Sequence, residues 1–69
     1  MHTNYYVIYE EDQAGSRSVL DIIDMSKTTL SQSTVIRYAR SMKSYGCRVF
    51  VYVEDNPKQP ARKIYASRK

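Results

Sequence analysis

The sequence is poor in the residues that build covalent or catalytic frameworks. Its 69 residues include one cysteine, Cys47, and one histidine, His2. A single thiol excludes a disulfide within the chain and is typical of a reducing compartment, while His2 lies at a terminus and gives no Ser–His pair. Two glycines, Gly15 and Gly46, are too few for a phosphate-cradling loop. We therefore expect no catalytic residues, metal site or cofactor, and neither enzyme activity nor a small-molecule substrate.

Long hydrophobic runs are also lacking. No segment approaches the ~20 apolar residues that a bilayer-spanning helix needs. The first residues, MHTNYYVIYEED, lack the basic start and long apolar stretch of a signal peptide. These absences predict a cytoplasmic protein with no membrane association.

Acidic residues are missing from the middle of the chain. No Asp or Glu occurs between Met25 and Val53. Over the whole sequence 11 Lys and Arg outnumber 7 Asp and Glu, which gives a net charge of +4. Such asymmetry often accompanies an anionic partner. The alternative is an acidic edge and a basic edge on an ordinary soluble surface.

Hydrophobic periodicity predicts four strands and one helix in a single small domain, residues 1–69. The expected strands are 4–11, 18–24, 47–54 and 62–68, and the expected helix runs from about residue 30 to 45. Loops at 12–17 and 55–61 indicate two hairpins. The order β-β-α-β-β predicts an α+β fold, a four-stranded antiparallel sheet with one helix on one face. The charges of the last strand place it at an edge.

The expected helix carries one stripe of small and apolar residues, with two competing start signals. Thr29 and Gln32 make a capping box, whereas Ser31 as the cap would let Leu30 pack onto Val35. Gly46 is expected to follow the last turn. The stripe consists of Ser31, Val35, Tyr38, Ala39, Met42 and Tyr45.

The strand CRVFVYVE separates two kinds of side chain by alternation. Cys47 and its three valines suit a core, whereas Arg48, Phe50 and Tyr52 point the other way. In the last strand Ile64 and Ala66 suit the core, which leaves Lys63, Tyr65 and Ser67 outside. Since one helix cannot cover both faces, we expect an open aromatic and basic surface that also includes one or two N-terminal tyrosines. Its predicted site residues are Arg48, Phe50, Tyr52, Lys63 and Tyr65.

Three roles fit such a surface. Aromatic rings flanked by bases can stack nucleobases and hold phosphates, Tyr and Arg are typical anchors of protein interfaces, and cross-strand tyrosines also stabilise a solvated sheet. The sequence favours a small non-catalytic protein that binds a protein partner or itself, as an adaptor, inhibitor or homodimer. Nucleic-acid binding is the alternative.

The helix offers a second basic surface. Arg37 and Arg40 are three residues apart and therefore neighbours, with Lys43 at the flank. Such a row could lie along phosphates, although a solvated helix face is the more usual explanation.

Overall fold

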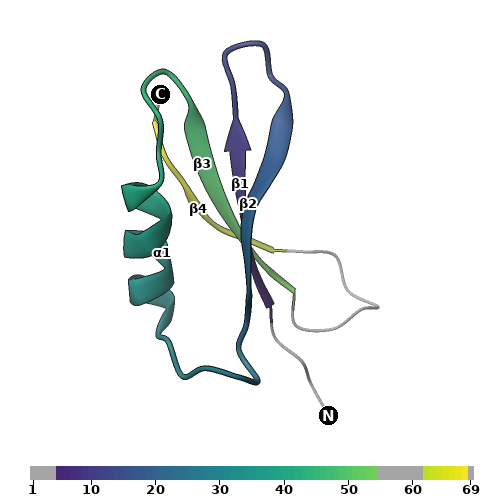
Figure 1. Cartoon of the computed structure of the whole chain (residues 1–69), viewed down its shortest axis with the longest axis vertical. Coiled ribbons are helices and arrows are strands. Elements are labelled where there is room, and N and C mark those ends of the chain that lie inside the picture. The colour runs from purple at the N-terminus through teal and green to yellow at the C-terminus, as the bar shows by residue number, and fades with distance from the viewer. Residues whose placement is uncertain (1–4, 55–61, 69) are drawn as a thin grey trace.

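The fold was analysed in a computed structural model that describes residues 5–54 and 62–68. The predictions for residues 1–4, 55–61 and 69, including the proline-containing connection, lie outside these ranges. The four antiparallel strands form one sheet in the order β2-β1-β3-β4, so the α+β prediction is confirmed (Figure 1). The elements are β1 (Tyr5–Glu11), β2 (Arg17–Asp24), α1 (Gln32–Ser41), β3 (Arg48–Glu54) and β4 (Arg62–Ala66).

The β1–β2 hairpin turns through the predicted loop. Asp12 Oδ1 accepts hydrogen bonds from the backbone N–H groups of Ala14 and Ser16, both at 2.9 Å. Gly15 adopts φ +88°, a conformation that side chains with a Cβ disfavour. The side chain of Asp12 therefore stabilises the turn of this loop.

Helix α1 starts at the second of the two predicted caps and ends earlier than expected. Ser31 is the N-cap, and its Oγ accepts the N–H of Thr34 at 3.2 Å. The helix ends at Ser41, and turns carry the chain from there to β3. Tyr45 is consequently 100% exposed. The prediction that it extends the buried stripe is wrong, because that stripe required the helix to continue.

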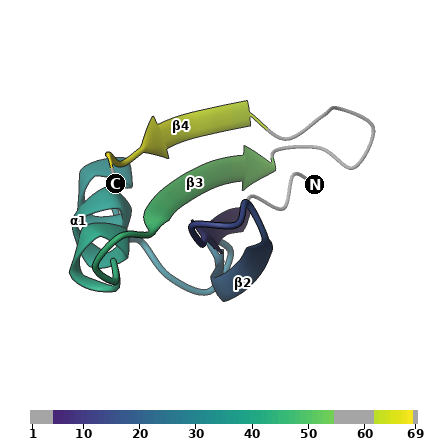
Figure 2. The same cartoon turned by 90° about the horizontal axis from the view of Figure 1, so that it is seen from above.

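The helix packs on one face of the sheet, chiefly against β3 (Figure 2). Val35 and Ala39 from α1 are fully buried against Ile8 of β1 and against Val49 and Val51 of β3. The alternation predicted for β3 is therefore confirmed for these valines. Val53 is buried as well, whereas Cys47 precedes β3 and is half-buried.

A β-bulge in β4 overturns the predicted orientation of its last residues. The register shifts between Val51 and Tyr52, so Tyr65 is paired with Val51 and packs against the helix-side core, as does Ile64. The prediction of Tyr65 on the open surface is wrong, because strict alternation fails at a bulge.

The bulge also places the two residues after Tyr65 on the faces opposite to those predicted. Ala66, predicted in the core, is exposed and paired with Phe50. Ser67, predicted outside, is buried, and its Oγ accepts the N–H of Val49 at 2.8 Å.

A second bulge lies in β2. The register of β1 against β2 shifts between Ile8 and Tyr9, and Leu20 is the extra residue on β2. Val19 and Ile22 consequently lie on the side of the sheet away from α1, whereas Leu20 packs against the helix-side core.

Candidate functional site: the outer face of the sheet

The sheet face opposite α1, called here the outer face, has no helix over it within the described residues (Figure 2). Directly paired residues of neighbouring strands share a face, so the strand registers fix its composition. The outer face consists of Tyr5, Val7, Tyr9, Glu11, Arg17, Val19, Ile22, Asp24, Arg48, Phe50, Tyr52, Glu54, Lys63 and Ala66.

Phe50 lies on the outer face, as predicted, but it is not exposed. Its side chain is only 2% exposed. Two guanidinium carbons lie over its ring, that of Arg17 at 4.6 Å and that of Arg48 at 4.8 Å from the centroid. The ammonium nitrogen of Lys63 is 5.7 Å away. The prediction of Phe50 as an accessible contact residue is therefore wrong, because long cationic side chains cover its ring.

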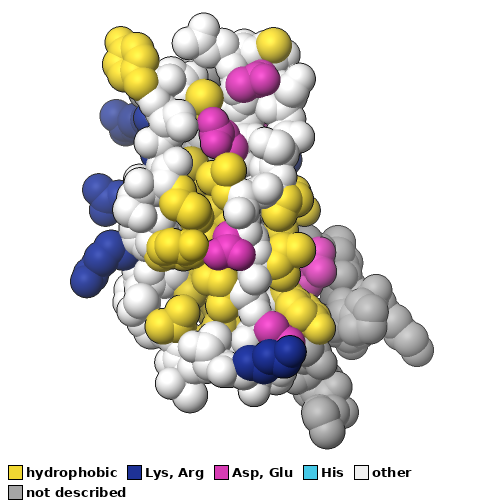
Figure 3. All heavy atoms as spheres, in the orientation of Figure 1, with side chains coloured by type: hydrophobic (Ala, Val, Ile, Leu, Met, Phe, Trp, Pro, Cys, Tyr) yellow, Lys and Arg dark blue, Asp and Glu magenta, His cyan; other side chains and the backbone are white. Residues whose placement is uncertain are grey.

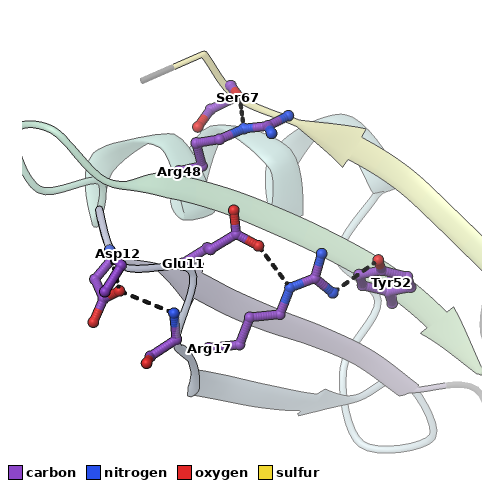
Figure 4. A network of polar contacts seen from close by, with 8 residues as sticks. Glu11, Asp12, Arg17, Arg48, Tyr52 and Ser67 are labelled. Atoms are coloured by element: carbon purple, nitrogen blue, oxygen red, sulfur yellow. Dashed lines mark hydrogen bonds and ion pairs between the residues drawn. The ribbon is translucent and has the colours of Figure 1, made fainter.

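Hydrogen bonds hold Arg17 in this position (Figure 4). Its Nε donates to Glu11 Oε2 at 3.0 Å, and its Nη1 donates to the Tyr52 hydroxyl at 3.4 Å. The bond to Glu11, and next the bond to Tyr52, raise the pKa of the Arg17 guanidinium above its ordinary value. Arg17 is thus a permanent cation with a restricted orientation.

Arg48 is anchored from the other side. Its Nε donates to the backbone carbonyl of Ser67 at 3.2 Å (Figure 4). The buried Ser67, displaced by the β4 bulge, therefore helps to position a cation of the outer face. Arginine guanidinium groups fixed in this way retain N–H edges that can bind carboxylates or phosphates.

Two tyrosines and two aliphatic residues complete the surface. The rings of Tyr9 and Tyr52 meet edge to face with centroids 5.5 Å apart, next to the buried Val7. Val19 and Ile22 on β2 are 51% and 57% exposed. The accessible part of the outer face thus combines tyrosines and three cations around Phe50 with an aliphatic strip on β2, and three acids, Glu11, Asp24 and Glu54, lie on the same face.

The predicted site residues fall into two groups in the structure. Arg48, Tyr52 and Lys63 are together on the outer face, around Phe50. The basic residues of the helix form a separate surface: Arg37 and Arg40 are exposed.

Lys43, the third base predicted for this surface, follows the end of the helix. Lys43 is half-buried beyond the helix end, in an open hollow of about 550 Å³. Gln13, Tyr45 and Gly46 complete the lining of the hollow. The backbone N–H of Lys43 donates to the carbonyl of Arg40 at 3.2 Å.

Within residues 5–54 and 62–68, no three His, Cys, Asp or Glu side chains are grouped to hold a metal ion, and no helix there is long and apolar enough to cross a membrane. A hydrogen bond with Glu10, followed by burial, raises the pKa of the Cys47 thiol. Cys47 is therefore kept as a thiol, the weakly nucleophilic form.

The sequence does not single out several residues of the outer face that carry its contacts. Its pattern places Arg17 in the loop, leaves Tyr9 as one of several ambiguous tyrosines, and marks Val19 and Ile22 only as strand residues. The pairing of Glu11 with Arg17 across the hairpin was a usable signal, since oppositely charged residues flank the loop. The bulge that exposes Val19 and Ile22 left no such signal.

No protein-family model, curated protein or solved structure matches this chain.

Proposed function

We propose that this protein is a small non-catalytic binding protein whose outer face binds a protein partner, as an adaptor or inhibitor does. The partner we infer presents apolar side chains next to carboxylates. Val19 and Ile22 would meet the apolar part, and the cations around Phe50 would meet the carboxylates. The observation that carries the proposal is the exposure of Val19 and Ile22, 51% and 57%, on the same face as those cations.

The geometry supports a protein partner better than a nucleic acid. Base stacking needs open aromatic faces, whereas Arg17 and Arg48 cover the ring of Phe50. A phosphate backbone would also leave Val19 and Ile22 without an apolar contact. Aromatic side chains and arginines around an apolar centre are instead typical of protein interfaces.

Two matched charge reversals test which surface binds. Lys63→Glu changes an exposed cation of the outer face, and Arg40→Glu changes an exposed cation of α1 by the same charge. Both variants and the wild type would be used to capture proteins from a cell lysate, with quantification by mass spectrometry. We expect a protein whose capture falls at least tenfold with Lys63→Glu and is unchanged with Arg40→Glu. Equal losses from both variants would indicate nonspecific charge attraction and contradict the proposal.

A gel shift with mixed DNA and RNA at two salt concentrations tests the alternative. Phosphate binding weakens steeply as salt rises. We expect no shift even at low salt. A salt-sensitive shift that Lys63→Glu abolishes would assign the outer face to nucleic acid and overturn the choice of a protein partner.

The proposed location is the cytoplasm. The free thiol of Cys47 suits a reducing compartment, and the outer face would find its partner there. Subcellular fractionation checks this location, and recovery of the protein in the membrane or secreted fraction would refute it.

A further inference from the structure

We propose that two copies of this chain pair through their β2 strands, antiparallel and related by a two-fold axis, with Val19 of each copy opposite Ile22 of the other. The pairing would join two sheets and place their outer faces side by side. It uses the backbone edge of β2, and the side chains of Val19 and Ile22, which the function proposed above also uses, would stay on the outer face of the joined sheet.

Strand β2 is an edge of the sheet, since in the order β2-β1-β3-β4 it is paired only with β1 within residues 5–54 and 62–68. It contains eight residues, and its two exposed aliphatic side chains, Val19 and Ile22, are unusual at an edge that must stay unpaired. In Figure 3 the hydrophobic side chains between the helix and the β1–β2 hairpin belong to the helix side of the sheet, whereas the strand register places Val19 and Ile22 on the opposite face. The other edge, β4, carries Arg62 and Lys63, which would oppose self-pairing by like-charge repulsion.

The bulge makes β2 self-complementary. In a regular strand, neighbouring residues lie on opposite faces, so a two-fold axis could not pair Val19 with Ile22, which are an odd number of positions apart. Here Leu20 is the extra residue, and both it and Asp21 lie on the helix side, since Asp21 is paired with Ile8. The order of faces along β2 therefore reads the same in both directions, and residues 17, 19, 22 and 24 lie on the outer face.

Charge follows the same symmetry. With Val19 opposite Ile22, Arg17 of each copy lies opposite Asp24 of the other. The Arg17 guanidinium itself lies over Phe50 of β3, on the far side of β1 from the free edge of β2, so it adds complementary charge near the interface and no direct ion pair. The pairing would thus bring together two aliphatic pairs, with residues of opposite charge at both ends of the paired strands.

A single strand edge is small beside a standard protein interface, so we expect a dimer that forms only as concentration rises. Sedimentation equilibrium from low micromolar to millimolar protein would show the mass rising from 8.1 kDa toward twice that value. Val19→Lys alone and Ile22→Glu alone should each weaken association at least tenfold. An equimolar mixture of the two variants should recover it, because the mixed dimer has one Lys–Glu pair and one native Val–Ile pair. Circular dichroism confirms that each variant is folded.

The control is Lys63→Glu, on the opposite edge of the same face, which should dimerise like the wild type. Disruption by Lys63→Glu would instead indicate that two outer faces pack against each other, and would overturn the edge pairing. A wild type that stays at 8.1 kDa throughout, or a mixture that associates no better than either variant alone, would also overturn it. Loss of self-association in these experiments leaves the capture test with Lys63→Glu and Arg40→Glu unaffected, so the two proposals fail separately.

Discussion

Phe50 points away from the helix and yet is as inaccessible as residues of the helix-side core, with 2% of its surface exposed. Two guanidinium groups and one ammonium group cover it. Arginine is weakly hydrated and stacks on aromatic rings with little loss of its hydrogen-bonding capacity. The ring of Phe50 is therefore buried on the outer face, because the side chains of Arg17, Arg48 and Lys63 cover it.

We expect Phe50→Ala to destabilise the fold by about 3–5 kcal/mol, the usual cost of emptying a buried aromatic site. Tyr45→Ala, at a residue that is 100% exposed, should change the free energy of unfolding by less than about 0.5 kcal/mol. Urea denaturation of both variants measures the difference. If both substitutions change the free energy of unfolding by equally small amounts, the cationic side chains do not bury Phe50 in solution.

Alternation in CRVFVYVE was enough to predict which way Arg48, Phe50 and Tyr52 point. It could not predict that Phe50 is buried, because Arg17 reaches the ring from β2, and β1 lies between β2 and β3. Burial on an open face depends on which long side chains arrive from other strands. That information lies in the strand order and register, which the sequence did not reveal.

At the scale of elements, one hydrogen bond joins the helix to the edge strand β2. The Tyr38 hydroxyl donates to Asp21 Oδ2 at 2.9 Å. This bond, and next the negative charge of Asp21, raise the pKa of Tyr38. A folded-state pKa above the unfolded one means that the contribution to stability is complete below the ordinary tyrosine range and is lost as pH rises through the raised pKa.

We expect Asp21→Ala to lower the pKa of Tyr38 toward its ordinary value and to remove this alkaline loss of stability. NMR titration of the Tyr38 ring carbon measures the pKa directly. The matched control is Asp24→Ala, another acid of β2, which should leave the Tyr38 titration as in the wild type. An unchanged Tyr38 pKa in Asp21→Ala would mean that α1 and β2 are not bridged in this way.

Element order and type were predictable from hydrophobic period and turn residues, including the hairpin at Gly15, whereas the sequence left the helix cap open between Thr29 and Ser31. The errors in helix length and in side-chain direction along β4 lie where the period breaks. A bulge in β4 turned Tyr65 inward and Ala66 outward, and α1 ended at Ser41 although an apolar stripe continues to Tyr45. Bulges and helix ends are set by tertiary packing, which periodicity alone does not encode.

For the whole molecule, one short helix cannot cover both faces of the sheet, so the two faces have different chemistry. The helix side is a conventional aliphatic core. The outer face combines fixed cations, a tyrosine pair and the exposed Val19 and Ile22. We propose that the helix side of the sheet maintains the fold and that the outer face binds a partner.

NMR chemical-shift mapping tests most directly whether the outer face is the binding surface. Isotope-labelled protein would be titrated with the partner recovered in the capture experiment, and amide shifts would be followed along the chain. We expect the largest changes at Tyr9, Val19, Ile22 and Tyr52 on the outer face. Changes confined to the helix surface around Arg37 and Arg40, with the outer face unperturbed, would contradict the assignment of the outer face as the binding site.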